Sequence, residues 1–327
     1  MKLKALVKDR NATGLEIAGD IEIKGLSADS RRVGPGFLFA ALPGSSTDGA
    51  KFAADAAARG AVAVLAPKGA ISTAEIPVIE VDDARLALAH AAAAFYARQP
   101  KFIAAVTGTN GKSSTVDFLR QIWAFGGKSA ASMGTLGAIG PFGAVDLGHT
   151  TPDPVAIHAT LARLFDEGVT HVAMEASSHG LDQRRLDGVE LSAAAFTNLT
   201  QDHLDYHHDL ETYAAAKLRL FTELLPRGAP AVKCRTGTSE GRASPWFCQS
   251  EVKLYSPSRY CVPSRLVADR PISAMRQATE AERSSVKMVS ELWLNGSERL
   301  PTKLMPEAML PRSFSRSIFS GSSWWKA

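Results

Sequence analysis

The chain has 327 residues and a formal net charge of +4. This length predicts two or more domains, and no apolar run approaches the roughly 20 residues of a membrane span. Residues 1–10 lack the long apolar segment of a secretory signal, so a cytoplasmic protein without membrane insertion is expected. A monomer is the expected oligomeric state.

The positive charge belongs to the last part of the chain. Residues 234–327 contain roughly 14 Lys and Arg against roughly 8 Asp and Glu, and the preceding residues have a small negative balance. Because the residues before 234 have an ordinary charge balance, this distribution predicts no nucleic-acid partner.

Residues 1–99 are predicted to form a small α/β domain. Their apolar patterns predict strands at 37–42, 61–66 and 77–81 and helices at 50–59 and 82–98. Asp82 or Asp83 is the expected N-cap of the second helix.

Residues 100–232 alternate between strand-like and helical patterns, which predicts a mostly parallel sheet covered by helices. The expected strands are 102–107, 170–175 and 192–197, and the expected helices are 112–125, 154–167 and 210–225. Sites in such sheets lie at the carboxyl ends of the strands, so the polar clusters that follow these strands are expected to meet at one edge.

The first cluster is a glycine turn between a strand and a helix. Gly108 and Gly111 allow backbone N–H groups to point at a phosphate, Lys112 can reach terminal phosphates, and the Ser113 hydroxyl can ligate Mg²⁺. Val106 stands where the common P-loop has glycine, so the loop is shorter. Nucleotide binding is the prediction, and a glycine-rich turn with a surface lysine is the alternative.

The second cluster follows the strand that ends near residue 174. Glu175 is predicted to ligate Mg²⁺, and the alternative is an acidic residue that the helix dipole favours. Gln183, Arg184 and Arg185 offer donors for a carboxylate or phosphate, with one arginine expected to be solvated.

The third cluster, residues 197–207, is rich in Asp, His and Asn. It could ligate a metal or hold a nucleotide, and ordinary capping and turn chemistry is the alternative.

Taken together, the clusters resemble the Mur ligase family over about residues 25–230. The motifs are TGTNGKSS at 107–114, TTPD at 150–153, EASSHGL at 175–181 and DHLDYH at 202–207. Residues 29–39 and 42–44 resemble the uridine-nucleotide domain of this family. The resemblance therefore implies a small uridine-nucleotide domain at 1–99, and at 100–232 part of a P-loop-type ATPase domain.

The resemblance also implies roles for individual residues. The ATP phosphates would be held by Gly108, Thr109, Asn110, Gly111, Lys112, Ser113 and Ser114. The UDP end of the substrate would contact Ser30, Ser45, Ser46 and Thr47. The muramoyl peptide would be positioned by Thr150, Thr151, Ser177, Gln183 and Arg185. Mg²⁺ would be held by Ser113, Glu175, His203 and Lys217, and the catalytic set would be Lys112, Glu175, His203 and Lys217.

The role of Lys217 depends on the family match. The helical pattern alone predicts an exposed side chain for Lys217, whereas the resemblance implies a lysine that is carbamylated and ligates Mg²⁺. An amine adds CO₂ only when it is neutral, so burial or nearby positive charge would have to lower its pKa. His149 stands where the family would have asparagine, and it is left out of the predicted substrate residues.

The implied reaction is an ATP-dependent amide bond formation. The motifs are most similar to those of members that add meso-diaminopimelate, or L-lysine, to UDP-N-acetylmuramoyl-L-alanyl-D-glutamate through an acyl phosphate, with ATP and Mg²⁺. Diaminopimelate is the preferred interpretation. The alternatives are a non-catalytic nucleotide-binding remnant, another Mur ligase, or a ligase similar to folylpolyglutamate synthase.

Residues 233–327 resemble no part of the family. All three cysteines and four of the five tryptophans lie there, serine is abundant, and no zinc-like cysteine spacing occurs. A disordered basic tail, a small extra domain and translation in a shifted reading frame after about Val232 are the interpretations, and the third is preferred. Without a recognisable C-terminal ligase domain, little or no ligase activity is expected, and UDP-substrate binding is expected to remain.

Overall fold

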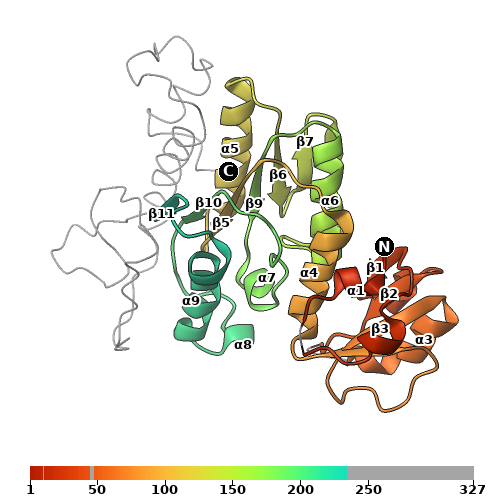
Figure 1. Cartoon of the computed structure of the whole chain (residues 1–327). Helices are drawn as coiled ribbons and strands as arrows, with labels where there is room; N and C mark the ends of the chain where they lie inside the picture. Colours follow the sequence, from red (N-terminus) through yellow and green to blue (C-terminus); the bar gives the residue numbers. More distant parts are fainter. Residues whose placement is uncertain (10, 45–47, 234–327) are drawn as a thin grey trace, which may run out of the picture. The chain divides into compact units, whose positions relative to one another are not determined.

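The computed structural model describes residues 1–9, 11–44 and 48–233. Within them the chain forms two sheets with helices packed against them, shown in Figure 1, so the predicted α/β class is confirmed. Ser45, Ser46 and Thr47 lie outside the described residues. The shifted-frame interpretation concerns residues 233–327, of which only Lys233 is described.

The first described sheet contains four parallel strands in the order β1-β2-β3-β4. These strands are β1 (Gly25–Ser27), β2 (Phe37–Ala40), β3 (Ala61–Pro67) and β4 (Val78–Val81). The helices of this part are α1 (Leu3–Leu6), α2 (Leu15–Ala18), η1 (Ser30–Arg32), η2 (Gly49–Phe52), α3 (Ala53–Ala58) and α4 (Ala84–Tyr96). Asp83 is the N-cap of α4, because its carboxylate accepts from the backbone N–H groups of Arg85 and Leu86.

The second sheet of the described part has the order β11-β10-β5-β9-β6-β7-β8. Its strands are β5 (Phe102–Thr107), β6 (Ala130–Gly134), β7 (Gly137–Gly140), β8 (Gly143–Val145), β9 (His171–Glu175), β10 (Ala193–Phe196) and β11 (Ala231–Lys233). The pairs from β11 to β6 are parallel, and β6, β7 and β8 form an antiparallel meander. The predicted mostly parallel sheet is therefore confirmed, and the antiparallel meander was not predicted.

The helices of this part cover both faces of the second sheet. They are α5 (Lys112–Phe125), α6 (Pro154–Asp166), α7 (Ser178–Asp182), α8 (Leu204–His207), α9 (Leu210–Arg219) and the π-helical segment η3 (Leu220–Leu224). Ile103 and Ala105 of β5 share a buried cluster with α6, whereas Ala104 and Val106 share one with α5. This alternation explains why β5 is apolar at consecutive positions.

The strand register determines where the polar clusters lie. Val106 pairs with Glu175, and Thr107 pairs with Phe196, so β5, β9 and β10 end at the same edge of the sheet. Gly134, the last residue of β6, follows Met133, which pairs with Met174. The motifs that follow these strands therefore meet at one edge, as predicted.

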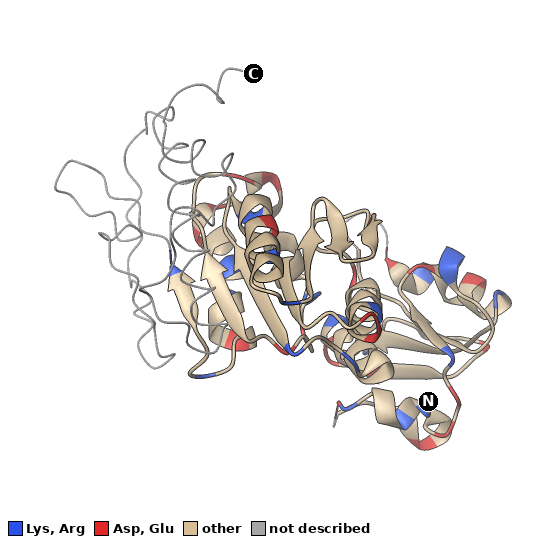
Figure 2. Ribbon diagram, turned by 90° about the horizontal axis from the view of Figure 1, so that it is seen from above, with Lys and Arg blue, Asp and Glu red and all other residues tan. Residues whose placement is uncertain are grey.

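Figure 2 shows acidic and basic residues interspersed over the described helices and loops. None of the helices among the residues that the structure describes is both long and apolar enough to cross a membrane.

Candidate functional site

The glycine turn after β5 has a backbone that only glycine adopts readily. Gly108 has φ +139° and Gly111 has φ +82°, and a Cβ at Gly108 would overlap the Thr197 hydroxyl. The loop then leads directly into α5, whose first turn contains Lys112, Ser113 and Ser114. A 14-residue helix that starts at a glycine loop presents backbone N–H groups and partial positive charge to an anion.

The start of the third cluster holds this turn in place. Thr109 N donates to Asn198 O at 2.9 Å, and Asn110 N donates to Asn198 Oδ1 at 3.0 Å. The Thr197 hydroxyl donates to Asn110 O at 2.7 Å. Thr197 and Asn198 therefore use their polar groups to shape the loop, which is the turn chemistry weighed as the alternative.

Lys112 folds back over the loop. Its Nζ donates to Gly108 O at 3.0 Å and to Thr109 O at 2.8 Å. Burial lowers the pKa of Lys112, while the negative charges of Glu175 and Asp202 act in the raising direction. The ammonium group thus lies within electrostatic reach of the carboxylate at the end of β9.

Lys217 of α9 reaches the same carbonyl oxygen from the other side of the loop. Its Nζ donates to Gly108 O at 2.8 Å and lies 4.4 Å from the centre of the Tyr213 ring. The side chain is 1% exposed, so the exposed position predicted from the helical pattern alone is wrong. Burial, together with the charge of Lys112, lowers the pKa of Lys217 to about 7, and Asp202 opposes the shift. A substantial fraction of this amine is therefore neutral near pH 7.

Glu175 ends β9 with a buried carboxylate. Its Oε1 accepts from Thr135 N at 2.9 Å, and a Cβ at Gly134 would overlap the same oxygen. Glycine at 134 therefore leaves the space that the carboxylate occupies. The carboxylate of Glu175 and the hydroxyl of Ser113 are oxygen donors, which suit Mg²⁺.

A protein-only metal cage does not occur here. No group of three or more His, Cys, Asp or Glu among the described residues is arranged to hold a metal ion. Mg²⁺ commonly uses one or two carboxylates together with phosphate oxygens and water, so the donors present fit Mg²⁺ that arrives with a nucleotide.

His203 lies in a cluster of rings beside the loop. It has φ +53°, precedes α8, and its imidazole lies 5.0 Å from that of His179 and 6.3 Å from the Tyr213 ring, centre to centre. Tyr213 also contacts Lys217 and shares a 3.2 Å hydrogen bond with the Thr109 hydroxyl. The rings therefore link His203 to Lys217 and to the glycine loop.

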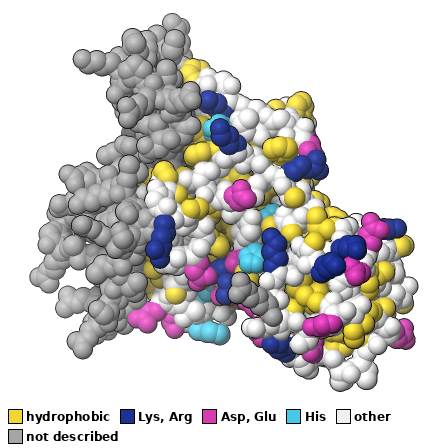
Figure 3. Space-filling view, in the orientation of Figure 1, with side chains coloured by type: hydrophobic (Ala, Val, Ile, Leu, Met, Phe, Trp, Pro, Cys, Tyr) yellow, Lys and Arg dark blue, Asp and Glu magenta, His cyan; other side chains and the backbone are white. Residues whose placement is uncertain are grey.

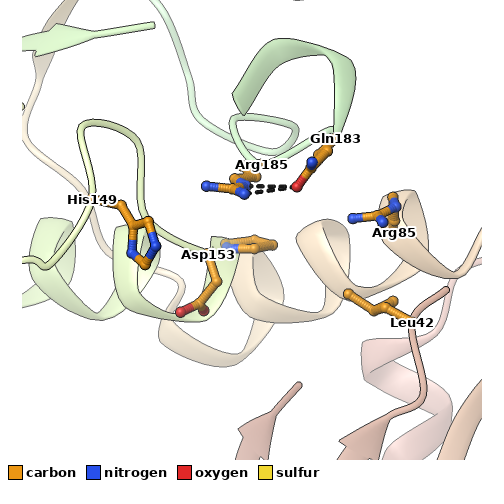
Figure 4. Close-up of a pocket in the computed structure, with 7 residues that line it drawn as sticks. Leu42, Arg85, His149, Asp153, Gln183 and Arg185 are labelled. Atoms are coloured by element: carbon orange, nitrogen blue, oxygen red, sulfur yellow. Dashed lines mark hydrogen bonds between the residues drawn. The ribbon is translucent and has the colours of Figure 1, made fainter. Parts of the chain in front are cut away.

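A cavity of about 200 Å³ lies beside this edge of the sheet. It is lined by Leu42, Arg85, His149, Asp153, Pro154, Gln183 and Arg185, most of which are labelled in Figure 4. Gln183 Oε1 accepts from Arg185 Nε at 3.2 Å and from Nη2 at 2.7 Å, and Arg185 Nη1 donates to Thr151 O. Basic, acidic and histidine side chains also gather near the middle of the face in Figure 3.

Thr151 connects the cavity to the end of β9. Its hydroxyl donates to Glu175 O at 3.1 Å and accepts from Ser177 N at 3.0 Å. The Ser177 hydroxyl in turn caps α7 by accepting from Gly180 N, and Thr150 shares a 2.9 Å hydrogen bond with Thr135. Of the predicted substrate residues, Thr150, Thr151, Ser177, Gln183 and Arg185 are thus brought together. Ser30 is the first residue of the short helix η1, which follows β1 of the first sheet, and it is buried.

Several residues of the cavity were not predicted from sequence. Arg85 was not singled out, Asp153 and Leu42 belonged to the motifs at 150–153 and 42–44 without an assigned role, and His149 was set aside because it differs from the family pattern. Arg85 carried a signal, because a cation in the first turn of a helix opposes the helix dipole. Only the fold brings the first turn of α4 beside the loop that follows α7.

Comparison with known proteins gives consistent matches. Residues 22–96 match the Mur ligase family catalytic domain, and residues 106–239 match the Mur ligase middle domain. A UDP-N-acetylmuramoyl-L-alanyl-D-glutamate--2,6-diaminopimelate ligase of Brucella melitensis is 58% identical over 233 residues, which cover 71% of this chain and 48% of the relative. The ligase of the same name from Rhizobium meliloti is 60% identical over 216 residues, 66% of this chain and 44% of the relative.

A solved structure of a ligase with this name is also similar. It has a TM-score of 0.59 and 31% identity, and the match covers 68% of this chain and 45% of that chain. The chain therefore spans about half the length of the curated relatives that it matches.

Proposed function

Because the chain belongs to the Mur ligase family, we propose that it takes part in peptidoglycan precursor synthesis as an ATP-dependent ligase that forms an amide bond. The proposed substrates are UDP-N-acetylmuramoyl-L-alanyl-D-glutamate and meso-diaminopimelate, following the names of the relatives. The observation that carries the proposal is the arrangement around Gly108, where two lysines meet a glycine loop beside Glu175.

The residues of the loop would hold the phosphates of ATP. Backbone N–H groups from Gly108 to Ser114 and the start of α5 supply donors, and Lys112 supplies a mobile positive charge. On binding, Lys112 would exchange its bonds to Gly108 O and Thr109 O for the terminal phosphates. Ser113, Glu175, His203 and carbamylated Lys217 are the proposed holders of Mg²⁺, which would neutralise charge on the phosphates.

The cavity beside Thr151 would hold the peptide of the muramoyl substrate. Arg185, supported by Gln183 and Thr151, suits a carboxylate, and the Thr150–Thr151 pair lies between this arginine and Glu175. Ser30, Ser45, Ser46 and Thr47 remain the proposed contacts of the UDP end.

The proposed reaction joins these two parts of the site. The γ-phosphoryl group of ATP passes to the terminal carboxylate of the D-glutamyl residue, and the amine of the incoming amino acid then displaces phosphate. The approach of two anions is the main obstacle, and Lys112 with the start of α5 would stabilise the charge that develops. The reaction would take place in the cytoplasm, with the protein as a monomer.

Nucleotide binding is the first test. Titration of the whole chain with Mg²⁺–ATP should give a saturable signal that Lys112→Met weakens at least about tenfold, since one charge-assisted contact is lost. Lys128→Met, at an exposed position just beyond the end of α5, is the matched control and should bind normally. Absence of binding by the soluble unmodified protein would contradict the proposal.

The second test measures the whole reaction. Any ADP release is expected to be slow and to depend on both UDP-N-acetylmuramoyl-L-alanyl-D-glutamate and diaminopimelate, and L-lysine should replace the latter poorly. ADP release that needs neither substrate would rule out the ligase. ATP binding without any substrate-dependent turnover would favour a non-catalytic nucleotide-binding protein.

A further inference from the structure

We propose that Arg85 is a second arginine contact for the carboxylate-bearing peptide of the substrate, from a different element of the cavity wall than Arg185. This inference rests on the proposed function, because that function supplies an acidic peptide at this cavity. It assigns a ligand-binding role to a residue of the first sheet's helix α4.

The position of Arg85 brings together two distant parts of the chain. Arg85 lies in the first turn of α4, and Arg185 follows α7, yet both side chains line the same cavity. Figure 4 shows the two arginines on different elements, with Asp153 and His149 on a third. A ligand in this cavity would therefore meet guanidinium groups from two sides.

Arg85 and Arg185 place two positive charges at one cavity. A cation in the first turn of a helix opposes the dipole, and the nearest acidic group of α4 is its N-cap, Asp83, whose Oδ1 accepts from backbone N–H groups. The charge of Arg85 also disfavours the charge on Arg185, whose pKa is lowered first by burial and then by Arg85, with Asp153 acting oppositely. Among the described lining residues, two arginines thus face one carboxylate, so an anionic ligand would relieve the repulsion.

Arg85 also has more donors to offer than Arg185. Within the part of the chain that the structure describes, the Arg85 side chain makes one hydrogen bond, from Nη2 to Pro43 O. Arg185 uses Nε, Nη1 and Nη2 to hold Gln183 and Thr151. Since a guanidinium group has five N–H donors, Arg85 keeps most of them for a ligand.

The Asp83 carboxylate joins the two sides of the cavity. Its Oδ1 accepts from the backbone N–H groups of Arg85 and Leu86, both at 3.0 Å. Its Oδ2 lies 2.6 Å from Nε of Arg184, the neighbour of Arg185. One carboxylate therefore fixes the backbone of Arg85 relative to the loop that carries Arg185, and this sets the spacing that a bound carboxylate would experience.

The test compares two ligands that differ in the D-glutamyl residue, which carries two carboxylates; the alanyl ligand keeps a single carboxylate one residue nearer the sugar. Calorimetric titration uses UDP-N-acetylmuramoyl-L-alanyl-D-glutamate and UDP-N-acetylmuramoyl-L-alanine with the unmodified chain and with Arg85→Gln. Loss of a charge-assisted hydrogen bond should weaken binding of the first ligand roughly 10- to 100-fold and change binding of the second less than about threefold. Arg85→Lys should give an intermediate loss, because it keeps the charge without the planar fork.

Arg98→Gln is the matched control. Arg98 lies just beyond the other end of α4 and pairs with Asp166 of α6, so it links the same two parts of the chain outside the cavity. This variant should bind both ligands normally. Circular dichroism checks the fold of each variant, and Arg85→Lys carries the comparison if Arg85→Gln does not fold.

The outcomes separate this inference from the proposed function. If the unmodified chain binds neither ligand, the proposed function fails and the inference fails with it. If it binds the glutamyl ligand and both Arg85 variants bind equally well, the proposed function stands and the inference is wrong. Equal weakening of the binding of both ligands would also overturn the inference, because Arg85 would then affect the structure of the protein and not the recognition of the glutamyl residue.

Discussion

The Nζ atom of Lys217 donates a 2.8 Å hydrogen bond to the carbonyl oxygen of Gly108, a residue 109 positions earlier in the chain. Lys112 donates to the same oxygen at 3.0 Å. Two cationic side chains thus converge on one peptide group at the phosphate loop. Burial, and after it the charge of Lys112, lowers the pKa of the more deeply buried Lys217 to about 7.

The lowered pKa of Lys217 predicts a pH-dependent stability. In the unfolded chain this amine has an ordinary pKa near 10.5, and in the folded chain about 7. Between these values the unfolded chain binds more protons, so the free energy of unfolding should rise with pH, by at most about 1.4 kcal/mol per unit. Below about pH 7 both states are protonated and the slope from this group vanishes.

Lys217→Met should remove that slope. Urea unfolding is measured for both proteins at pH 7, 8 and 9 in bicarbonate-free buffer. The midpoint of the unmodified chain should rise with pH relative to the midpoint of Lys217→Met. Lys101→Met, at an exposed position, should follow the unmodified chain throughout. Parallel pH profiles for unmodified protein and Lys217→Met would contradict the lowered pKa.

Gly134→Ala should damage the proposed magnesium site. The new Cβ would overlap Glu175 Oε1 and displace the carboxylate, so Mg²⁺-dependent ATP binding should weaken at least about tenfold, equivalent to about 1.4 kcal/mol. Gly140→Ala is the control in the neighbouring strand, because its Cβ would make only ordinary contacts with Leu164 and Ala131. Equal ATP affinities for the two variants would argue against a role for the Glu175 carboxylate.

Arg219→Met should destabilise the fold strongly. Arg219 Nη2 lies 2.5 Å from Asp187 Oδ1, and the two side chains are 10% and 5% exposed. The other Asp187 oxygen already has no hydrogen-bond partner among the described residues, so losing Arg219 leaves a poorly compensated buried charge. The free energy of unfolding should fall by about 3–5 kcal/mol.

Arg59→Met provides the comparison for this prediction. Arg59 pairs with Asp55 at 3.0 Å, but both side chains are over 40% exposed, so its loss should cost at most about 1 kcal/mol. Denaturant unfolding of both variants measures the difference. Similar losses for Arg59→Met and Arg219→Met would show that burial does not strengthen the Asp187 pair.

Asp83→Asn should separate helix capping from the ion pair with Arg184. Asparagine still caps α4, and the ion pair is partly exposed, so the free energy of unfolding should change by less than about 1 kcal/mol. Affinity for UDP-N-acetylmuramoyl-L-alanyl-D-glutamate should nevertheless fall severalfold, because the spacing of Arg85 and Arg185 is no longer fixed. Calorimetry checks this, with Asp166→Asn as the control that should bind normally. Unchanged affinity in Asp83→Asn would show that the pair does not organise the cavity.

The elements with strong local signals were predicted closely. The strand at 102–107 and the helix at 112–125 have the predicted bounds, because an apolar run, a glycine turn and a helical pattern follow one another there. The short strands β1, β6, β7 and β8 were missed, since three to five residues rich in glycine or alanine have no clear alternation. The predicted helix at 210–225 consists of α9 and the π-helical η3.

The sequence predicted the motif residues of the candidate site but not all of the residues that the fold brings beside them. The glycine loop and Glu175 were singled out because each belongs to a continuous motif, and Arg185 was singled out because it follows the motif at 175–181. Arg85 and His149 were not included, and the buried environment of Lys217 was visible only through the family resemblance. Their positions depend on contacts between elements far apart in the chain.

The amino-acid sequence by itself determined the α/β class, the glycine loop between β5 and α5 and the family, because these depend on short runs of residue types whose backbone preferences are local. The tertiary structure alone decided which charges share a space: Lys217 with Lys112 at Gly108, and Arg85 with Arg185 at one cavity. Burial and charge proximity arise from packing between distant elements, so the chemistry of these side chains became apparent only in the folded chain.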